Sequence, residues 1–131
     1  MALLIGASAA LAALSPSQLN EDPAAHDGQV VEVRGYLHLT SGGHVLYEAR
    51  SDLALFSDLT RVKNLDRALR RCLTVHYAPA LKVRLMRRNE GDVVLKGRFH
   101  ATYLKEGAVD PGACSGPTAI MVDDVRPAKT G

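Results

Sequence analysis

Two stretches of the chain alternate apolar and polar residues and carry a glycine in the middle of the alternation. In residues 27–36 and 90–99 an acidic residue and a glycine come before a pair of valines, and Gly35 and Gly97 interrupt the pattern. Alternation with a period of two predicts half-buried β-strands. A glycine inside such a strand is typical of a bulge or a sharp bend, which a small sheet needs in order to close. The two stretches therefore predict two strongly bent strands of a small β structure.

The rest of the chain is predicted to contain more strands and a few short helices. Ser15 and Gln18 have the spacing of a capping box with Pro16 at the first helical position, so a helix is predicted to begin there and to end at Pro23. Periodicity predicts strands at residues 31–39, 44–50, 72–77, 92–103 and 118–125, an amphipathic helix at 61–71, and a further helix at 79–88.

Composition fits one soluble domain and argues against one class of binding surface. The 131 residues are 47% hydrophobic and 23% charged, which is typical of a single globular domain. We assign this domain to residues 15–126 and a tail to 127–131. Only 5% of the residues are aromatic and there is no Trp, so a platform of rings that stack on nucleic-acid bases is disfavoured.

The small net charge of +2 conceals an uneven distribution along the chain. Residues 20–58 include two basic and seven acidic side chains, whereas residues 60–105 include twelve basic and three acidic ones. A basic segment of this kind either binds an anionic partner or forms a solvated surface that attracts the acidic segment within the fold. Both interpretations stay open at the level of sequence.

The first fourteen residues carry no charged side chain and are predicted to be a signal peptide or an apolar N-terminal helix. Their length matches the apolar region of a signal peptide and is shorter than the roughly 20 residues that cross a bilayer. Ala10 and Ala12 are small residues at the positions that a signal peptidase reads. We therefore expect a periplasmic or secreted protein without a transmembrane span in its mature chain, with a cytoplasmic location as the alternative.

The order of the predicted elements resembles the OB-fold, a five-stranded Greek-key barrel. The segments DGQVVEVRGYLHL, EGDVVLKGRFHATY and AIMVDDVRP are similar to those of small bacterial envelope and tRNA-anticodon-like OB domains of unknown function. The resemblance implies a mainly β fold with a helix between the third and fourth strands and a helical insertion at residues 52–71, before the third strand. An SH3-type barrel is the alternative, but it does not require the helix at residues 79–88.

The same resemblance implies a disulfide between the two cysteines. In OB-folds the third and fifth strands lie side by side and parallel, so their starts are neighbours. Cys72 begins the third predicted strand and Cys114 comes just before the fifth. In an exported protein such a pair is expected to be oxidised.

No pattern in the sequence is typical of an enzyme, a metal site or a cofactor site. The chain lacks metal-spaced Cys or His clusters, a phosphate-binding Gly loop and a nucleophile elbow. His38 and His44 flank one predicted hairpin, but two imidazoles without a further ligand are a weak metal signal. Asp123 and Asp124 are expected to point to opposite faces of a strand. We therefore expect a protein that is not an enzyme and that requires no cofactor.

The polar face of the predicted barrel is the candidate binding surface. The resemblance makes the first and fourth strands neighbours, and their outward side chains could bind an anion by charge and hydrogen bonding. The alternative is a solvated face with Glu32 paired to Lys96 or Arg98. We expect an exported OB-fold binding module whose ligand is an anionic small molecule or an envelope protein; the alternative is a cytosolic module that binds single-stranded nucleic acid. The candidate ligand-binding residues are Tyr36, His38, Lys96, Arg98, His100 and Thr102.

Overall fold

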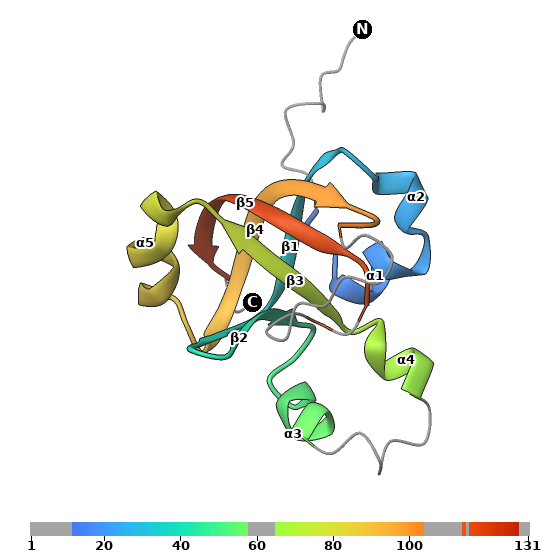
Figure 1. The fold of residues 1–131 in the computed structure, drawn as a ribbon, viewed down its shortest axis with the longest axis horizontal. Helices are drawn as coiled ribbons and strands as arrows, with labels where there is room; N and C mark the ends of the chain where they lie inside the picture. The colour runs from blue at the N-terminus through green and yellow to red at the C-terminus, as the bar shows by residue number, and fades with distance from the viewer. Residues whose placement is uncertain (1–11, 58–64, 104–113, 115, 129–131) are drawn as a thin grey trace, which may run out of the picture.

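Five β-strands form a closed ring in the computed structural model, which describes residues 12–57, 65–103, 114 and 116–128 (Figure 1). Neighbouring strands follow the order β1-β2-β3-β5-β4, and β4 returns to β1. The expected mainly β class is therefore confirmed. The strands are β1 (Val30–Thr40), β2 (Gly43–Tyr47), β3 (Cys72–Tyr77), β4 (Gly91–His100) and β5 (Ala119–Pro127).

One parallel pair lies within an otherwise antiparallel ring. β1 pairs antiparallel with β2 and with β4, and β4 pairs antiparallel with β5. β3 and β5 run parallel, with Thr74 opposite Ala119. A parallel pair needs a crossover connection, and here the crossover passes through a helix and β4.

The interior of the ring holds one apolar core, and a helix packs a leucine into it from each of two sides. Leu37, Leu95 and Phe99 from the strands are fully buried there. Leu19 from α1 (Pro16–Glu21) and Leu85 from α5 (Lys82–Arg87) belong to the same core and are also fully buried. α1 and α5 lie on different sides of the ring (Figure 1). Each buried leucine stabilises the fold by about 1.5 to 3 kcal/mol, so both helices are fixed to the ring.

Both mid-strand glycines lie where a neighbouring strand approaches closely. A Cβ atom on Gly97 would lie 2.0 Å from the carbonyl oxygen of Met121, and one on Gly35 would lie 2.4 Å from that of Tyr47. The β4–β5 register also shifts between Lys96 and Gly97, as expected of a bulge. The predicted bulge is therefore confirmed at Gly97. The ladder between β1 and β4 passes through Gly35 without a register shift, and Gly35 instead permits the close approach of Tyr47.

The helices are short and begin close to the predicted positions. α1 begins with the capping box of Ser15 and Gln18 and ends before Pro23, which starts α2 (Pro23–His26). The insertion before β3 contains α3 (Asp52–Ser57) and α4 (Leu65–Leu69), so only part of the predicted helix at 61–71 falls within the described residues. A 3-10 turn (Pro79–Leu81) leads into α5, as predicted for residues 79–88.

Two predicted strands are longer than those observed. The second strand was expected to reach Arg50 but ends at Tyr47, because the carboxylate of Asp52 accepts a hydrogen bond from the Ala49 amide and turns the chain toward α3. The fourth strand ends at His100 instead of residue 103. The next amide, of Ala101, donates to the side chain of Asp27 rather than to a strand.

The predicted disulfide is present and lies in a second apolar cluster outside the ring. Cys72 and Cys114 are bonded, with their Cα atoms 5.9 Å apart. They pack with Tyr36, Val45 and Tyr47. Tyr47 points away from the interior of the ring, because its neighbour Leu46 occupies the core and adjacent strand residues face opposite sides. The disulfide fastens the start of β3 to the segment before β5.

The described part of the chain holds no helix that is long and apolar enough to cross a membrane. The predicted signal peptide falls mainly on residues 1–11, which lie outside the described residues. Leu14, however, belongs to the folded domain. Its amide donates to the carbonyl of Glu32 at 2.8 Å, and its carbonyl accepts from the Arg34 amide at 2.8 Å. These bonds form a parallel bridge beside β1.

Candidate functional site

The six candidate residues on β1, β4 and the segment after β4 do not form one surface. We expected them to lie beside one another, but the antiparallel register places Tyr36 opposite Asp92, and it places Lys96 opposite Glu32. High residue numbers on β1 therefore meet low numbers on β4. Tyr36 and His38 lie toward one end of the shared ladder, whereas Arg98, His100 and Thr102 lie toward or beyond the other end.

Tyr36 and His38 are held together by Glu90, a residue that the sequence did not single out. The Tyr36 hydroxyl donates to one oxygen of the Glu90 carboxylate at 2.7 Å, and Nδ1 of His38 lies 2.6 Å from the other. Burial, followed by the bond to Glu90, raises the pKa of the Tyr36 phenol. Tyr36 is only 4% exposed, so it is part of the packing and not the open ligand contact that its outward position predicted.

Lys96 and Arg98 lie on the outward face of β4, and the expected ion pair with Glu32 is made by a different residue. Glu32 accepts from the guanidinium of Arg126 on β5 instead of pairing with Lys96 or Arg98. Arg98 donates to the backbone carbonyl of Gly28. The sequence does not indicate Arg126 as the partner of Glu32, because β5 lies beside β4 only in the folded ring. This part of the face is a solvated network of strand-to-strand pairs.

His100 and Thr102 line a shallow cleft together with His76, Tyr103 and Met121. The cleft has a volume of about 380 Å³. The rings of His76 and Tyr103 meet edge to face with their centroids 4.8 Å apart. Among the described residues no group of three or more His, Cys, Asp or Glu side chains is placed to hold a metal.

The two histidines of the first hairpin have separate partners. His38 contacts Glu90, whereas the His44 ring lies 5.4 Å from that of His76. Nδ1 of His44 lies 2.8 Å from the carbonyl oxygen of Val75, and because a carbonyl only accepts, this nitrogen carries the proton. In these contacts, His38 and His44 therefore have different partners, although they lie on the same hairpin.

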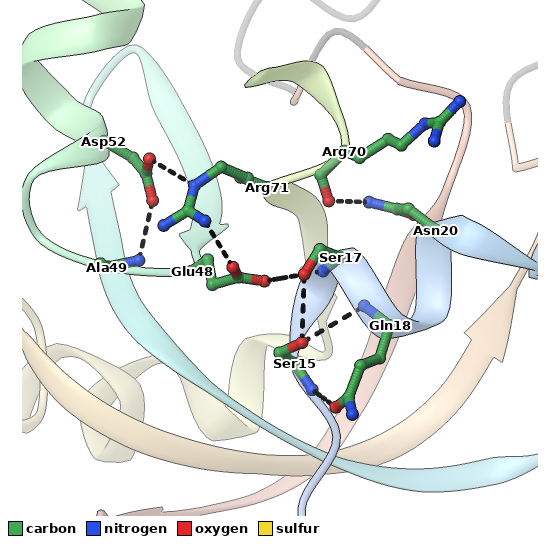
Figure 2. A network of polar contacts seen from close by, with 9 residues as sticks. All are labelled: Ser15, Ser17, Gln18, Asn20, Glu48, Ala49, Asp52, Arg70 and Arg71. Carbon is green, nitrogen blue, oxygen red and sulfur yellow. Dashed lines mark hydrogen bonds and ion pairs between the residues drawn. The ribbon is translucent and has the colours of Figure 1, made fainter. Parts of the chain in front are cut away.

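A polar network fastens α1 to the insertion and to β3 (Figure 2). The Glu48 carboxylate lies between Arg71, which donates to it at 2.7 Å, and Ser17, which donates through its backbone amide at 2.9 Å and through its hydroxyl. Arg71 also donates to Asp52 at 2.8 Å. Burial alone would raise the pKa of Glu48, but the bonds from Ser17 and the charge of Arg71 together lower it.

The cleft beside this network has mixed charge. Its volume is about 380 Å³ and its charged lining consists of three arginines and two glutamates. Arg71 is held by Glu48 and Asp52, whereas Arg70 turns its guanidinium away from the network in Figure 2. The positive charge of this cleft is therefore largely balanced from within. The charged lining residues are Glu21, Glu48, Arg67, Arg70 and Arg71.

Replacing Glu48 with Gln is expected to lower the free energy of unfolding at neutral pH by about 1 to 2 kcal/mol, because it weakens charge-assisted bonds to Ser17 and Arg71. A folded-state pKa below the ordinary value of 4.5 stabilises the fold fully above that value, and the stabilisation is lost as pH falls through the lowered pKa. The difference between the two proteins should therefore shrink in acid. Urea unfolding between pH 7 and pH 3 measures it, with the exposed Glu21→Gln as a control that removes the same charge; a constant difference would contradict the role of the Glu48 charge.

The third charged region is on α5 and its flanks, and we call it the basic surface: Lys82, Arg84, Arg87 and Arg88. All four side chains are exposed, and the three arginines line a hollow of about 150 Å³ against Val125. Arg84 donates to Asp124, and this hydrogen bond lowers the pKa of the Asp124 carboxyl. Within the described ranges, Lys82, Arg87 and Arg88 make no ion pair.

The spacing of the arginines in the sequence indicates the basic surface, which the count of charges in residues 60–105 does not. Arg84, Arg87 and Arg88 are spaced by three and four residues, which places them on one side of a helix. Leu85, which lies between them in sequence, is fully buried, so the side of the helix that carries the arginines faces outward. The basic residues of segment 60–105 therefore do not form one surface. Arg67, Arg70 and Arg71 belong to the separate cleft near α1.

The comparisons with known proteins add no relative to this picture. The sequence matches no protein-family model and no curated protein. The function is therefore argued from the surfaces described above.

Proposed function

We propose that the protein is an exported, non-enzymatic OB-fold module that binds an anionic partner through the basic surface. The observation that carries the proposal is the cluster of four exposed cationic side chains of which Arg84 alone meets an acidic side chain among the described residues. Cations gathered without local counter-charges attract anions, and arginines bind phosphate and carboxylate groups with paired hydrogen bonds.

The OB-fold assignment is supported by the strand order and by the connections. The ring runs β1-β2-β3-β5-β4, β3 lies parallel to β5, and α5 comes between β3 and β4. Export is supported by the disulfide of Cys72 and Cys114, since such bonds persist in oxidising compartments. Cleavage after Ala12 would keep Leu14 and its bridge to β1 in the mature protein.

Binding of single-stranded nucleic acid by a cytosolic form is the second candidate, and the structure offers it less support. Such binders stack bases on exposed rings. Tyr36 is 4% exposed and Tyr47 is 9% exposed, so neither offers an open face to a base. The basic surface itself includes no aromatic residue.

The proposed function predicts that Arg87→Gln/Arg88→Gln weakens binding of inorganic polyphosphate about tenfold or more, because two charge-assisted contacts are removed. Titration of the labelled polyanion at several salt concentrations measures the change. The logarithmic salt dependence should also become less steep in the variant, because fewer counter-ions are released.

The control is Arg34→Gln/Arg50→Gln, which removes the same charge from exposed residues on β1 and after β2. This control should retain binding within about twofold. Equal losses in both variants would mean that net charge alone attracts polyphosphate and would contradict a defined surface. Much tighter binding of an oligonucleotide than of polyphosphate of equal charge would favour the nucleic-acid candidate.

A further inference from the structure

The basic surface also exposes two apolar side chains. Val83 is 62% exposed and Met86 is 45% exposed, and both lie on α5. Their spacing of three residues places them on the same side of the helix, while Leu85 is fully buried in the core. α5 therefore presents an apolar pair next to cations in a single turn and a half of helix.

This combination separates two kinds of anionic partner. A soluble polyanion contacts cations and gains nothing from an exposed valine and methionine. At the surface of an anionic bilayer, in contrast, cations contact headgroups while neighbouring apolar side chains enter the boundary between headgroups and acyl chains. The apolar pair therefore favours a lipid surface over a soluble anion.

The position of α5 in the fold suits contact with an extended surface. Figure 1 shows α5 on the outside of the ring, on a different side from α1, α2 and α4. Its attachment through Leu85 leaves Val83, Met86 and the cations on the outer side. Asp124 is the one acidic residue that contacts these cations among the described residues, and it contacts Arg84 only.

We infer that the protein docks reversibly on a bilayer with anionic headgroups, with Val83 and Met86 inserted between the headgroups and with Lys82, Arg87 and Arg88 facing the lipid phosphates. This inference rests on the proposed function, because the same cations supply the attraction to anions. The docking is shallow, since a helix of this length lies on the surface and does not cross it.

The test uses the full chain and vesicles of phosphatidylcholine with or without phosphatidylglycerol, and it measures the fraction of protein that sediments with them. The wild type should bind only the vesicles that contain phosphatidylglycerol. Val83→Ser/Met86→Ser should weaken this binding about tenfold while leaving polyphosphate binding unchanged. Arg87→Gln/Arg88→Gln should weaken both, about fivefold for each charge removed from the vesicle surface.

The chain offers a closely matched control in Val30→Ser/Met121→Ser. These two side chains are 44% and 43% exposed and lie on β1 and β5, away from α5. They are also near neighbours, because both stand opposite Arg98 of β4. The control should bind vesicles as the wild type does. Thermal unfolding of each variant confirms that the fold is intact, since every substituted side chain is exposed.

The outcomes separate the two proposals. If polyphosphate binding depends on Arg87 and Arg88 but vesicles are not bound, or are bound equally well by the Val83 and Met86 variant, the membrane inference is overturned and the proposed function stands. Binding of poly-glutamate that depends on Val83 and Met86, without vesicle binding, would overturn it in favour of an acidic protein. If neither polyphosphate nor vesicles respond to the arginine changes, both proposals fail.

Discussion

Gly97→Ala is expected to lower the free energy of unfolding by about 3 kcal/mol, at the upper end of the cost of overpacking. The added Cβ would lie 2.0 Å from the carbonyl oxygen of Met121, 2.8 Å from its carbonyl carbon, and 2.9 Å from Cα of Val122. All three are backbone atoms, so no side chain can rotate away to relieve the contact. β4 and β5 must separate at this point, which disrupts their ladder where it helps to close the ring. Urea unfolding monitored by circular dichroism measures the loss.

Gly42→Ala is the matched control for this prediction. A Cβ at Gly42, in the turn between β1 and β2, would have no atom within 4 Å. The change should therefore alter stability by no more than about 0.5 kcal/mol. Similar losses at Gly42 and Gly97 would contradict the close strand approach and would point to a general effect of replacing glycine.

The sequence predicted the features of the fold that depend on local chemistry. The alternation around Gly35 and Gly97 places two strands correctly, and the Ser15 capping box places the start of α1. Both signals act between residues that are close in sequence. The predicted β3 also matches the observed strand Cys72–Tyr77, because its residues alternate regularly and Pro79 follows closely after its end.

The candidate site could not be predicted with the same success, because its geometry depends on contacts between distant segments. The alternation indicates correctly that Tyr36 and His38 point away from the core. It does not show that a second cluster and Glu90 cover this side of the ring, since Glu90 is 54 residues from Tyr36. The register between β1 and β4, which separates Tyr36 from Arg98, is likewise a property of the assembled ring.

Glu90 shows how strongly such a long-range contact can act on the chain. It is the one residue other than glycine with a positive φ among the described residues, at 59°. That conformation costs an ordinary residue about 1 to 2 kcal/mol and is usual for glycine or asparagine at the end of a helix. The bonds to Tyr36 and His38 offset this cost. The sequence predicts a turn between the helix that ends at residue 88 and the strand that begins at residue 92. It does not explain why this turn holds a glutamate at position 90.

Cys72→Ala/Cys114→Ala is expected to lower the free energy of unfolding by about 4 kcal/mol, because the disulfide closes a loop with a sequence separation of 42 residues and restricts the unfolded chain. Domains of this size are commonly stable by about 5 to 15 kcal/mol, so the loss removes a large share of the total. Urea unfolding of the oxidised wild type and of the variant measures the difference. Alanine is preferred to serine because both positions are buried and a hydroxyl would need a partner there.

The reduced wild type provides the control. Reduction breaks the same bond but leaves both cysteine side chains in place. Its stability should fall close to that of the alanine variant, with the remaining difference reporting only the packing of the two thiols beside Tyr47 and Val45. Equal stability of the oxidised and reduced proteins would contradict the role of the bond.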